Sequence, residues 1–294
     1  MPHTSKLNLK EILSSARRQG WAVPHFNISD IAMLRGLVEA ANELRAPILV
    51  GTSEGESDFL GRRQAVALVS AFREEHNLPI FINADHCHSV STAKAAVDAG
   101  YDSVHIDLSK LPLDDNIAGT KKIVAYARAK NTDISVEGEV GYLVTDSSQV
   151  YKRAIAVPVE SLAKVEDAKR FIKETGVDRL APAVGTLHGI AANAPRIDIE
   201  RVQAISKALG NTILVLHGGS GAPDEQIRKA IAAGIANIHF STDIRLAYVA
   251  ALREFIMEHP EETTPYKILA PAVEAVRLKA MEKIKLMGAA GRLS

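Results

Sequence analysis

The stretch PIFINADHCHSVSTAKAAVDAGYDSVHID, residues 79–107, contains the repeating unit from which the fold can be predicted. An apolar run at Pro79–Asn83 precedes a segment with helical periodicity at Ser91–Ala99, and a second apolar run follows at Ser103–Ile106. Such runs recur along the chain. The eight expected strands are Trp21–Phe26, Pro47–Gly51, Pro79–Asn83, Ser103–Ile106, Asp133–Glu137, Arg179–Val184, Thr212–Leu216 and Ala236–Phe240.

Helical patterns separate the expected strands, and many begin at Asp, Ser or Asn and end near Gly or Asn. Strand–helix alternation implies a parallel sheet, and eight units is the number that closes as a barrel. We therefore expect an α/β fold, a single (β/α)8 TIM barrel over residues 1–294 with an extra C-terminal helix. A doubly wound open sheet is the alternative. The expected helices include Asp30–Leu44, Arg62–Glu75, Ser91–Ala99, Asn116–Ala129, Ile199–Leu209, Asp224–Ala233 and Pro265–Leu286, and another helix begins after Phe240-Ser-Thr-Asp243.

The composition excludes several classes of protein. The 294 residues are 47% hydrophobic, enough for a large core, and 35 basic residues balance 35 acidic ones without a basic run. We therefore expect a small-molecule partner, with no nucleic acid and no membrane. The single cysteine, Cys87, suits a reducing compartment, and Met1 to Leu13 lacks the apolar stretch of a signal peptide. A cytoplasmic enzyme is expected.

Three histidines follow three of the expected strands: His86, His188 and His217. The strand ends of a closed barrel converge on one face, and three imidazoles with an open fourth position are typical of catalytic zinc. A histidine at one strand end is more often only packed there, but the joint placement favours a metal site. His25, His88 and His105 lie near strand ends too, so the sequence leaves them open as ligands.

Carboxylates accompany these histidines. Asp85 is the best candidate for proton transfer, although it could instead orient a histidine ligand. Asp107, Glu137 and Glu139 end the fourth and fifth strands, where they suit a second metal position or support for the ligands. Cys87 is expected to be a bystander.

Glycine-rich and hydroxyl-bearing turns follow the last two strands. The loop Gly218–Gly221 exposes backbone N–H groups beside Ser220, and the eighth strand ends in Ser241 and Thr242. Loops seven and eight form the commonest phosphate site of this barrel. A long polar insertion between Glu139 and Val165 would lie on the same face and is expected to be a functional loop.

Eight motifs, in order and spacing, resemble class II fructose-bisphosphate aldolases and the related tagatose-bisphosphate enzymes over most of the chain. They are Phe26-Asn-Ile, Ala84-Asp-His, Ile106-Asp-Leu-Ser, Glu137-Gly-Glu-Val-Gly, Gly185-Thr-Leu-His-Gly, Leu216-His-Gly-Gly-Ser-Gly, Ser241-Thr-Asp and Gly288-Ala-Ala-Gly. The resemblance implies that His86, His188 and His217 bind zinc, and that Asp85 exchanges a proton with the C4 hydroxyl of the substrate.

The resemblance also implies a site for the dihydroxyacetone-phosphate end of the substrate, often with a monovalent cation. The backbones of Gly189 and Gly218 would hold that end together with Ser220 and Thr242. The whole expected substrate-binding set is Asn27, Ser53, Gly189, Gly218, Ser220, His239, Ser241 and Thr242.

Three positions depart from the family pattern. The family's acidic Gly-Gly-Glu-Glu/Gln-Asp segment, whose acid is thought to handle the C3 proton, reads Leu143-Val-Thr-Asp-Ser-Ser here. Asp146 is therefore the expected base, with Glu160 as a less favoured alternative. On the eighth strand, Asn237 replaces a Lys and His239 replaces a substrate-binding Asn. The family's Asp-Pro-Arg-Lys before the terminal helix is Thr264-Pro-Tyr-Lys267.

The sequence thus predicts a zinc-dependent ketose-bisphosphate aldolase that forms a homo-oligomer, a dimer or tetramer. It would cleave fructose or tagatose 1,6-bisphosphate to dihydroxyacetone phosphate and glyceraldehyde 3-phosphate. One alternative is a non-catalytic barrel subunit that binds zinc or sugar phosphate and supports a partner aldolase, which the missing Glu pair favours. Another is a Schiff-base aldolase, which the absence of lysine from the expected strands disfavours.

Overall fold

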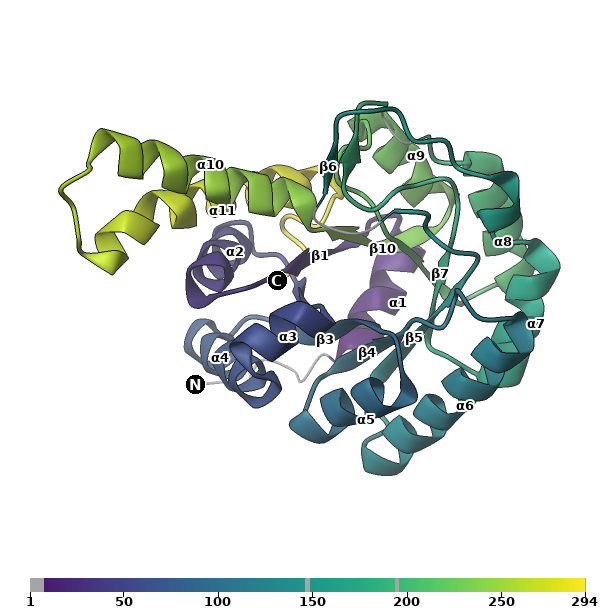
Figure 1. The fold of residues 1–294 in the computed structure, drawn as a ribbon. Coiled ribbons are helices and arrows are strands. Elements are labelled where there is room, and N and C mark those ends of the chain that lie inside the picture. The colour runs from purple at the N-terminus through teal and green to yellow at the C-terminus, as the bar shows by residue number, and fades with distance from the viewer. Residues whose placement is uncertain (1–7, 146–148, 194–195, 294) are drawn as a thin grey trace.

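The computed structural model describes residues 8–145, 149–193 and 196–293. Its eight main strands are all parallel and close into a barrel in the order β1-β10-β9-β7-β5-β4-β3-β2 (Figure 1). The predicted barrel is confirmed, and the open-sheet alternative is wrong. The strands are β1 (Val23–Asn27), β2 (Ile48–Thr52), β3 (Ile80–Cys87), β4 (Ser103–Ile106), β5 (Ser135–Val140), β7 (Arg179–Pro182), β9 (Ile213–Leu216) and β10 (Ile235–Phe240).

Helices surround the barrel as the alternating pattern requires (Figure 1). Their apolar faces pack on the outside of the strands, because each amphipathic helix can bury one stripe only against the sheet. The surrounding helices are α2 (Ile31–Glu43), α3 (Glu54–Leu60), α4 (Arg62–His76), α5 (Val90–Ala99), α6 (Leu113–Lys130), α7 (Val165–Thr175), α8 (Ile199–Leu209) and α9 (Asp224–Ala233).

Helix α1 (Leu9–Gln19) lies across the amino-terminal end of the barrel, a helix the sequence analysis did not expect. A capping box between Asn8 and Glu11 begins it, and Gly20, with φ of 70°, ends it. Arg17 donates to the backbone carbonyl oxygens that precede β9 and β10. The active face is therefore the opposite end of the barrel.

The long insertion contains structure of its own. A two-residue strand, β6 (Val150–Tyr151), pairs in parallel with β8 (Ile190–Ala191), and the 3-10 helix η1 (Val159–Ser161) follows. The Thr145 hydroxyl donates to the carbonyl oxygen of His188 at 2.9 Å. The insertion is thus fastened to the loop that carries His188.

Helices α10 (Thr242–Glu258) and α11 (Pro265–Leu286) form a hairpin that extends beyond the barrel (Figure 1), which we call the helical arm. Helix α11 packs against α2 and is the extra C-terminal helix that the sequence predicts. At Gly36, a Cβ atom would lie 2.5 Å from the carbonyl oxygen of Val273, so only glycine permits this close approach. Within the described ranges, no helix is both long and apolar enough to span a bilayer.

Candidate active site

The main pocket opens at the carboxyl ends of the strands, where barrel enzymes hold their substrates. Within the described ranges, the predicted site residues line it with two exceptions. Glu137 lies behind His217, and Glu160, the less favoured candidate base, does not line the pocket. Asp146 lies outside the described residues. Among the unpredicted residues, Lys110 is the one Lys or Arg that lines the described pocket. The predicted lining residues are Asn27, Ser53, Asp85, His86, Asp107, Glu139, His188, Gly189, His217, Gly218, Ser220, His239, Ser241 and Thr242.

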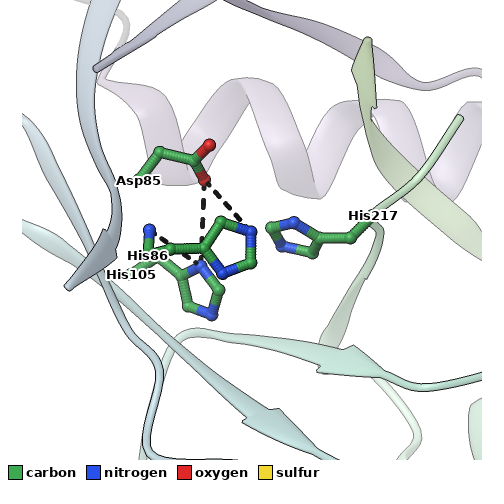
Figure 2. Close-up of side chains that lie close together, drawn as sticks. All are labelled: Asp85, His86, His105 and His217. Atoms are coloured by element: carbon green, nitrogen blue, oxygen red, sulfur yellow. Dashed lines mark hydrogen bonds and ion pairs between the residues drawn. The ribbon is translucent and has the colours of Figure 1, made fainter. Parts of the chain in front are cut away.

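The three predicted histidine ligands converge at the pocket floor. The ring centroid of His86 lies 4.6 Å from that of His217 and 4.8 Å from that of His188, and the last two lie 6.0 Å apart. His105 adds a fourth imidazole, 4.5 Å from His86 (Figure 2). Ligand atoms of Asp85, His86, His105 and His217 all lie within 4.8 Å of one another, so His105 stays open as a ligand.

An irregular end of β3 presents His86. The register between β3 and β4 shifts between Ala84 and Cys87, and His86 has a left-handed φ of 50°, rare for a residue with a side chain. Its Nδ1–H donates to Asp107 Oδ2 at 2.8 Å, because a carboxylate can only accept, and Nε2 is left for a ligand. Strained backbone of this kind is typical of functional positions.

The carboxylates around His86 favour positive charge. Burial lowers the pKa of His86, but Asp85 and Asp107 outweigh it and raise this pKa to about 10. Burial together with Asp107 raises the pKa of Glu139 well above its usual range. Burial opposes ionisation of Asp107 itself, yet His86 and His105 hold its pKa below the usual range. A metal cation bound at this position would be stabilised by the same negative charges.

His217 is held from behind by a carboxylate. Its Nε2–H donates to Glu137 Oε1 at 2.7 Å, which leaves Nδ1 as the ring nitrogen with a free lone pair. The other oxygen of Glu137 lies 2.9 Å from Arg179 Nη1, and both side chains are fully buried. Burial would raise the pKa of Glu137, but Arg179, His105 and His217 hold it well below its usual range.

Asp85 is oriented through Asn27, the residue that ends β1. The Asn27 amide nitrogen donates to Asp85 Oδ2 and to Glu56 Oε2, both at 3.0 Å. Glu56 in turn pairs with Arg245 of α10. The sequence analysis missed Glu56, although its capping box with Ser53 at the start of α3 was a readable signal.

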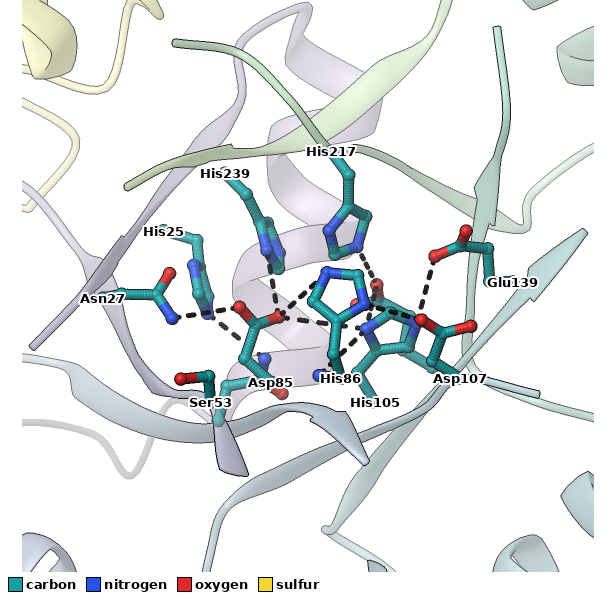
Figure 3. A network of polar contacts seen from close by, with 12 residues as sticks. His25, Asn27, Ser53, Asp85, His86, His105, Asp107, Glu139, His217 and His239 are labelled. Carbon is teal, nitrogen blue, oxygen red and sulfur yellow. Dashed lines mark hydrogen bonds and ion pairs between the residues drawn. The ribbon is translucent and has the colours of Figure 1, made fainter. Parts of the chain in front are cut away.

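His239 and His25 form a stacked pair beside Asp85 (Figure 3), since β10 and β1 are neighbours in register. Their ring centroids lie 3.5 Å apart with an interplanar angle of 6°. His239 Nδ1 lies 3.4 Å from Asp85 Oδ1, and the Asn83 amide donates to His25 Nε2 at 3.2 Å. His239 therefore lies between the pocket and the buried His25.

The glycine-rich turns line the same pocket as the histidines and carboxylates, and their backbones approach neighbouring chain segments closely. A Cβ at Gly218 would lie 2.2 Å from the Leu187 carbonyl oxygen, and one at Gly189 would lie 2.3 Å from that of Gln149. The Ser220 hydroxyl accepts from the backbone N–H of Asp243 at 3.2 Å, at the start of α10. The positive end of α10 beside these turns favours a phosphate there.

The residues present fit a divalent cation. Asp85 Oδ1, Glu139 Oε2 and His105 Nε2 are buried without a hydrogen-bond partner in the described structure, which is costly unless something satisfies them. Neutral imidazoles next to carboxylates form the donor set that divalent transition metals prefer. None of the barrel strands carries a lysine, so nothing in the barrel wall could form an imine.

Known proteins are similar to this chain over nearly its whole length. The profile of the family described as "Fructose-bisphosphate aldolase class-II" matches residues 7–292. A fructose-bisphosphate aldolase of Geobacillus stearothermophilus is 33% identical over 291 residues, 98% of this chain and 99% of that protein. One of Staphylococcus aureus is 35% identical over 289 residues, 97% and 98% of the two chains. The crystal structure of the YdjI aldolase of Escherichia coli K12 matches with a TM-score of 0.84 and 27% identity, covering 98% of this chain and 99% of that one.

Fold and site thus define a metal-dependent aldehyde-lyase built on a (β/α)8 barrel. The chain belongs to the class II fructose-bisphosphate aldolase family. Membership excludes the Schiff-base alternative, because class II enzymes use a metal ion in place of a lysine.

Proposed function

We propose that this chain is a zinc-dependent ketose-bisphosphate aldolase that reversibly cleaves fructose or tagatose 1,6-bisphosphate. The observation that carries the proposal is the meeting of His86, His188 and His217 with Asp85 next to the glycine-rich turns. One pocket thereby combines a metal-type ligand set, an acid–base group and a phosphate-type cradle. Two relatives named fructose-bisphosphate aldolase, 33% and 35% identical, support the choice of substrate class.

The chemistry follows from the positions of these groups. A bound zinc ion would polarise the ketone and stabilise the negative charge that cleavage leaves next to it. Asp85, held by Asn27, takes the proton from the C4 hydroxyl during cleavage and returns it in the reverse direction. We assign the removal of the C3 proton to Asp146 of the insertion, with Glu160 as the less favoured alternative.

The phosphate of the dihydroxyacetone half would lie on Gly189, Gly218, Ser220, Ser241 and Thr242, together with a monovalent cation. If it does, dihydroxyacetone phosphate binds far more tightly than dihydroxyacetone, through charge-assisted hydrogen bonds from backbone N–H groups. A calorimetric titration of both compounds measures the difference. Equal affinities would mean that these loops are only turns.

One experiment tests the assignment as a whole. Zinc content is measured together with cleavage of a panel of ketose 1,6-bisphosphates that differ at C4. We expect bound zinc and turnover of the fructose or the tagatose compound, and activity that survives borohydride added with substrate. Covalent trapping of a lysine would refute the mechanism. Protein that binds zinc and dihydroxyacetone phosphate but neither cleaves nor exchanges protons would favour a non-catalytic subunit.

We also infer a homo-oligomer formed through the helical arm, with a second copy of the chain as the partner. Leu246, Val249, Ile256 and Met257 of α10 are 44%, 37%, 48% and 78% exposed. At 100° per residue they lie within about 100° of one another around the helix. An apolar stripe on a projecting arm is self-complementary across a twofold axis, and pairing would bury it in both copies.

Two further expectations complete the proposal. We infer that residues 1–294 form one functional domain, which is supported by the family match over 7–292. We also infer a cytoplasmic location, which is supported by the lone cysteine of the chain.

A further inference from the structure

A fully buried arginine stands at the centre of the barrel. Arg179, the first residue of β7, has no exposed surface and does not line the pocket. Its Nη1 lies 2.9 Å from Glu137 Oε2 and donates to Asn237 Oδ1 at 3.0 Å. Its Nη2 donates to Asn83 Oδ1 at 3.2 Å and to the Ser103 hydroxyl. One guanidinium therefore connects side chains from β3, β4, β5 and β10.

Burying an arginine costs free energy because the guanidinium loses its hydration, so a contribution to stability does not by itself explain its presence. Ion pairs this deep often contribute no more than well-packed apolar side chains of similar volume, because both charges lose their hydration. Such a group is better explained by what it holds in place. Of the partners of Arg179, Glu137 is the one that also bonds a predicted metal ligand.

The contacts form a chain of three side chains toward the pocket. Arg179 holds Glu137 Oε2, and Glu137 Oε1 accepts the Nε2–H of His217 at 2.7 Å. With Nε2 engaged as a donor, the neutral imidazole carries its lone pair on Nδ1. The contact between Arg179 and Glu137 is a buried ion pair through Nη1 and Oε2, and this attraction keeps Oε2 on the arginine side while Oε1 stays turned toward His217.

We propose that Arg179 is a positioning residue for the metal site, acting through Glu137 to set the ring orientation and tautomer of His217. The inference rests on the proposed role of His217 as a ligand. Part of the affinity for the metal would then depend on an arginine inside the barrel that does not contact the substrate. Contacts behind metal-bound histidines typically change metal affinity ten- to a hundredfold when they are lost.

The test measures metal binding instead of turnover. Zinc affinity by chelator competition and the visible absorption spectrum of the cobalt-substituted protein are compared for wild type and Arg179→Met. We expect zinc affinity to fall at least tenfold and the cobalt bands to shift. The matched control is Arg73→Met, which removes a half-buried arginine that pairs with Asp102 away from the pocket. The control should leave both readouts unchanged.

Two double variants keep the inference open to refutation if Arg179→Met folds poorly. Arg179→Met combined with Glu137→Gln removes both buried charges, and should bind zinc as Glu137→Gln alone does, because the arginine acts through that carboxylate. Arg179→Met combined with Asn237→Lys places a cation on β10, where residue 237 already contacts Arg179, and should restore affinity.

The outcomes separate this inference from the proposed function. A folded Arg179→Met protein with wild-type zinc affinity and cobalt spectrum would overturn the role of Arg179 while leaving the metal site intact. A further loss of affinity in the double variant relative to Glu137→Gln would also overturn it, since Arg179 would then act by another route. Wild-type protein that binds no zinc would instead refute the proposed metal centre.

Discussion

Replacing Asp85 with Asn should separate cleavage from proton exchange. Asp85 is 6% exposed, and its Oδ2 accepts from the Asn27 amide while Oδ1 has no hydrogen-bond partner in the described structure. An amide of the same shape keeps the packing but cannot take a proton from the C4 hydroxyl. General acid–base groups contribute roughly a hundred- to ten-thousandfold, about 3 to 5 kcal/mol of barrier.

The assay compares two reactions on the same protein. Cleavage of the ketose bisphosphate should slow by at least about a hundredfold. Exchange of the C3 proton of dihydroxyacetone phosphate in heavy water, followed by proton NMR, should persist, because that compound has no C4 hydroxyl. Metal content is measured in parallel as a control. Equal loss of both reactions with zinc retained, or full cleavage by Asp85→Asn, would refute the role given to Asp85.

Three other predictions concern the insertion, the lone thiol and the helical arm. Asp146→Asn should slow C3 exchange by roughly a hundredfold while zinc stays bound, and unchanged exchange would point to another base such as Glu160. Burial, reinforced by Glu54 and Asp85, raises the pKa of Cys87 to about 12, so its thiol should stay protonated and resist alkylation at pH 8 until the protein unfolds. Rapid labelling of native protein would contradict this. Met257→Glu should shift the oligomer toward monomer in sedimentation velocity, and an unaltered profile would place the interface elsewhere.

Much of the fold could be predicted because barrel strands and helices carry clear periodic patterns. The bounds of β4, α8, α9 and α11 agree with the sequence prediction. The two-residue strands β6 and β8 could not be found, since no alternation is visible over so short a run. Helix α3 is seven residues long, and only its capping box indicates it.

The metal-type histidines and carboxylates were found through one rule, that side chains at the strand ends meet on one face, and the resemblance to the aldolase family added the substrate-binding residues. The rule could not predict what lies behind them. Strand β5 continues to Val140, three residues past the prediction, so Glu137 and Glu139 both point into the barrel, two positions apart. Whether a carboxylate faces the pocket or a neighbouring histidine depends on distances across the barrel. The positions of Arg179 and Glu56 likewise became clear only when the strands were assembled.

Metal dependence tests the central claim most directly. Zinc content and ketose-bisphosphate cleavage are measured for the native protein, after a strong chelator, and after zinc is added back, alongside His217→Ala. We predict about one tightly bound zinc per chain, loss of activity on chelation and recovery with zinc, because a site with three protein ligands tolerates no vacancy. His217→Ala should lack both metal and activity. Full activity in a metal-free preparation would contradict the account.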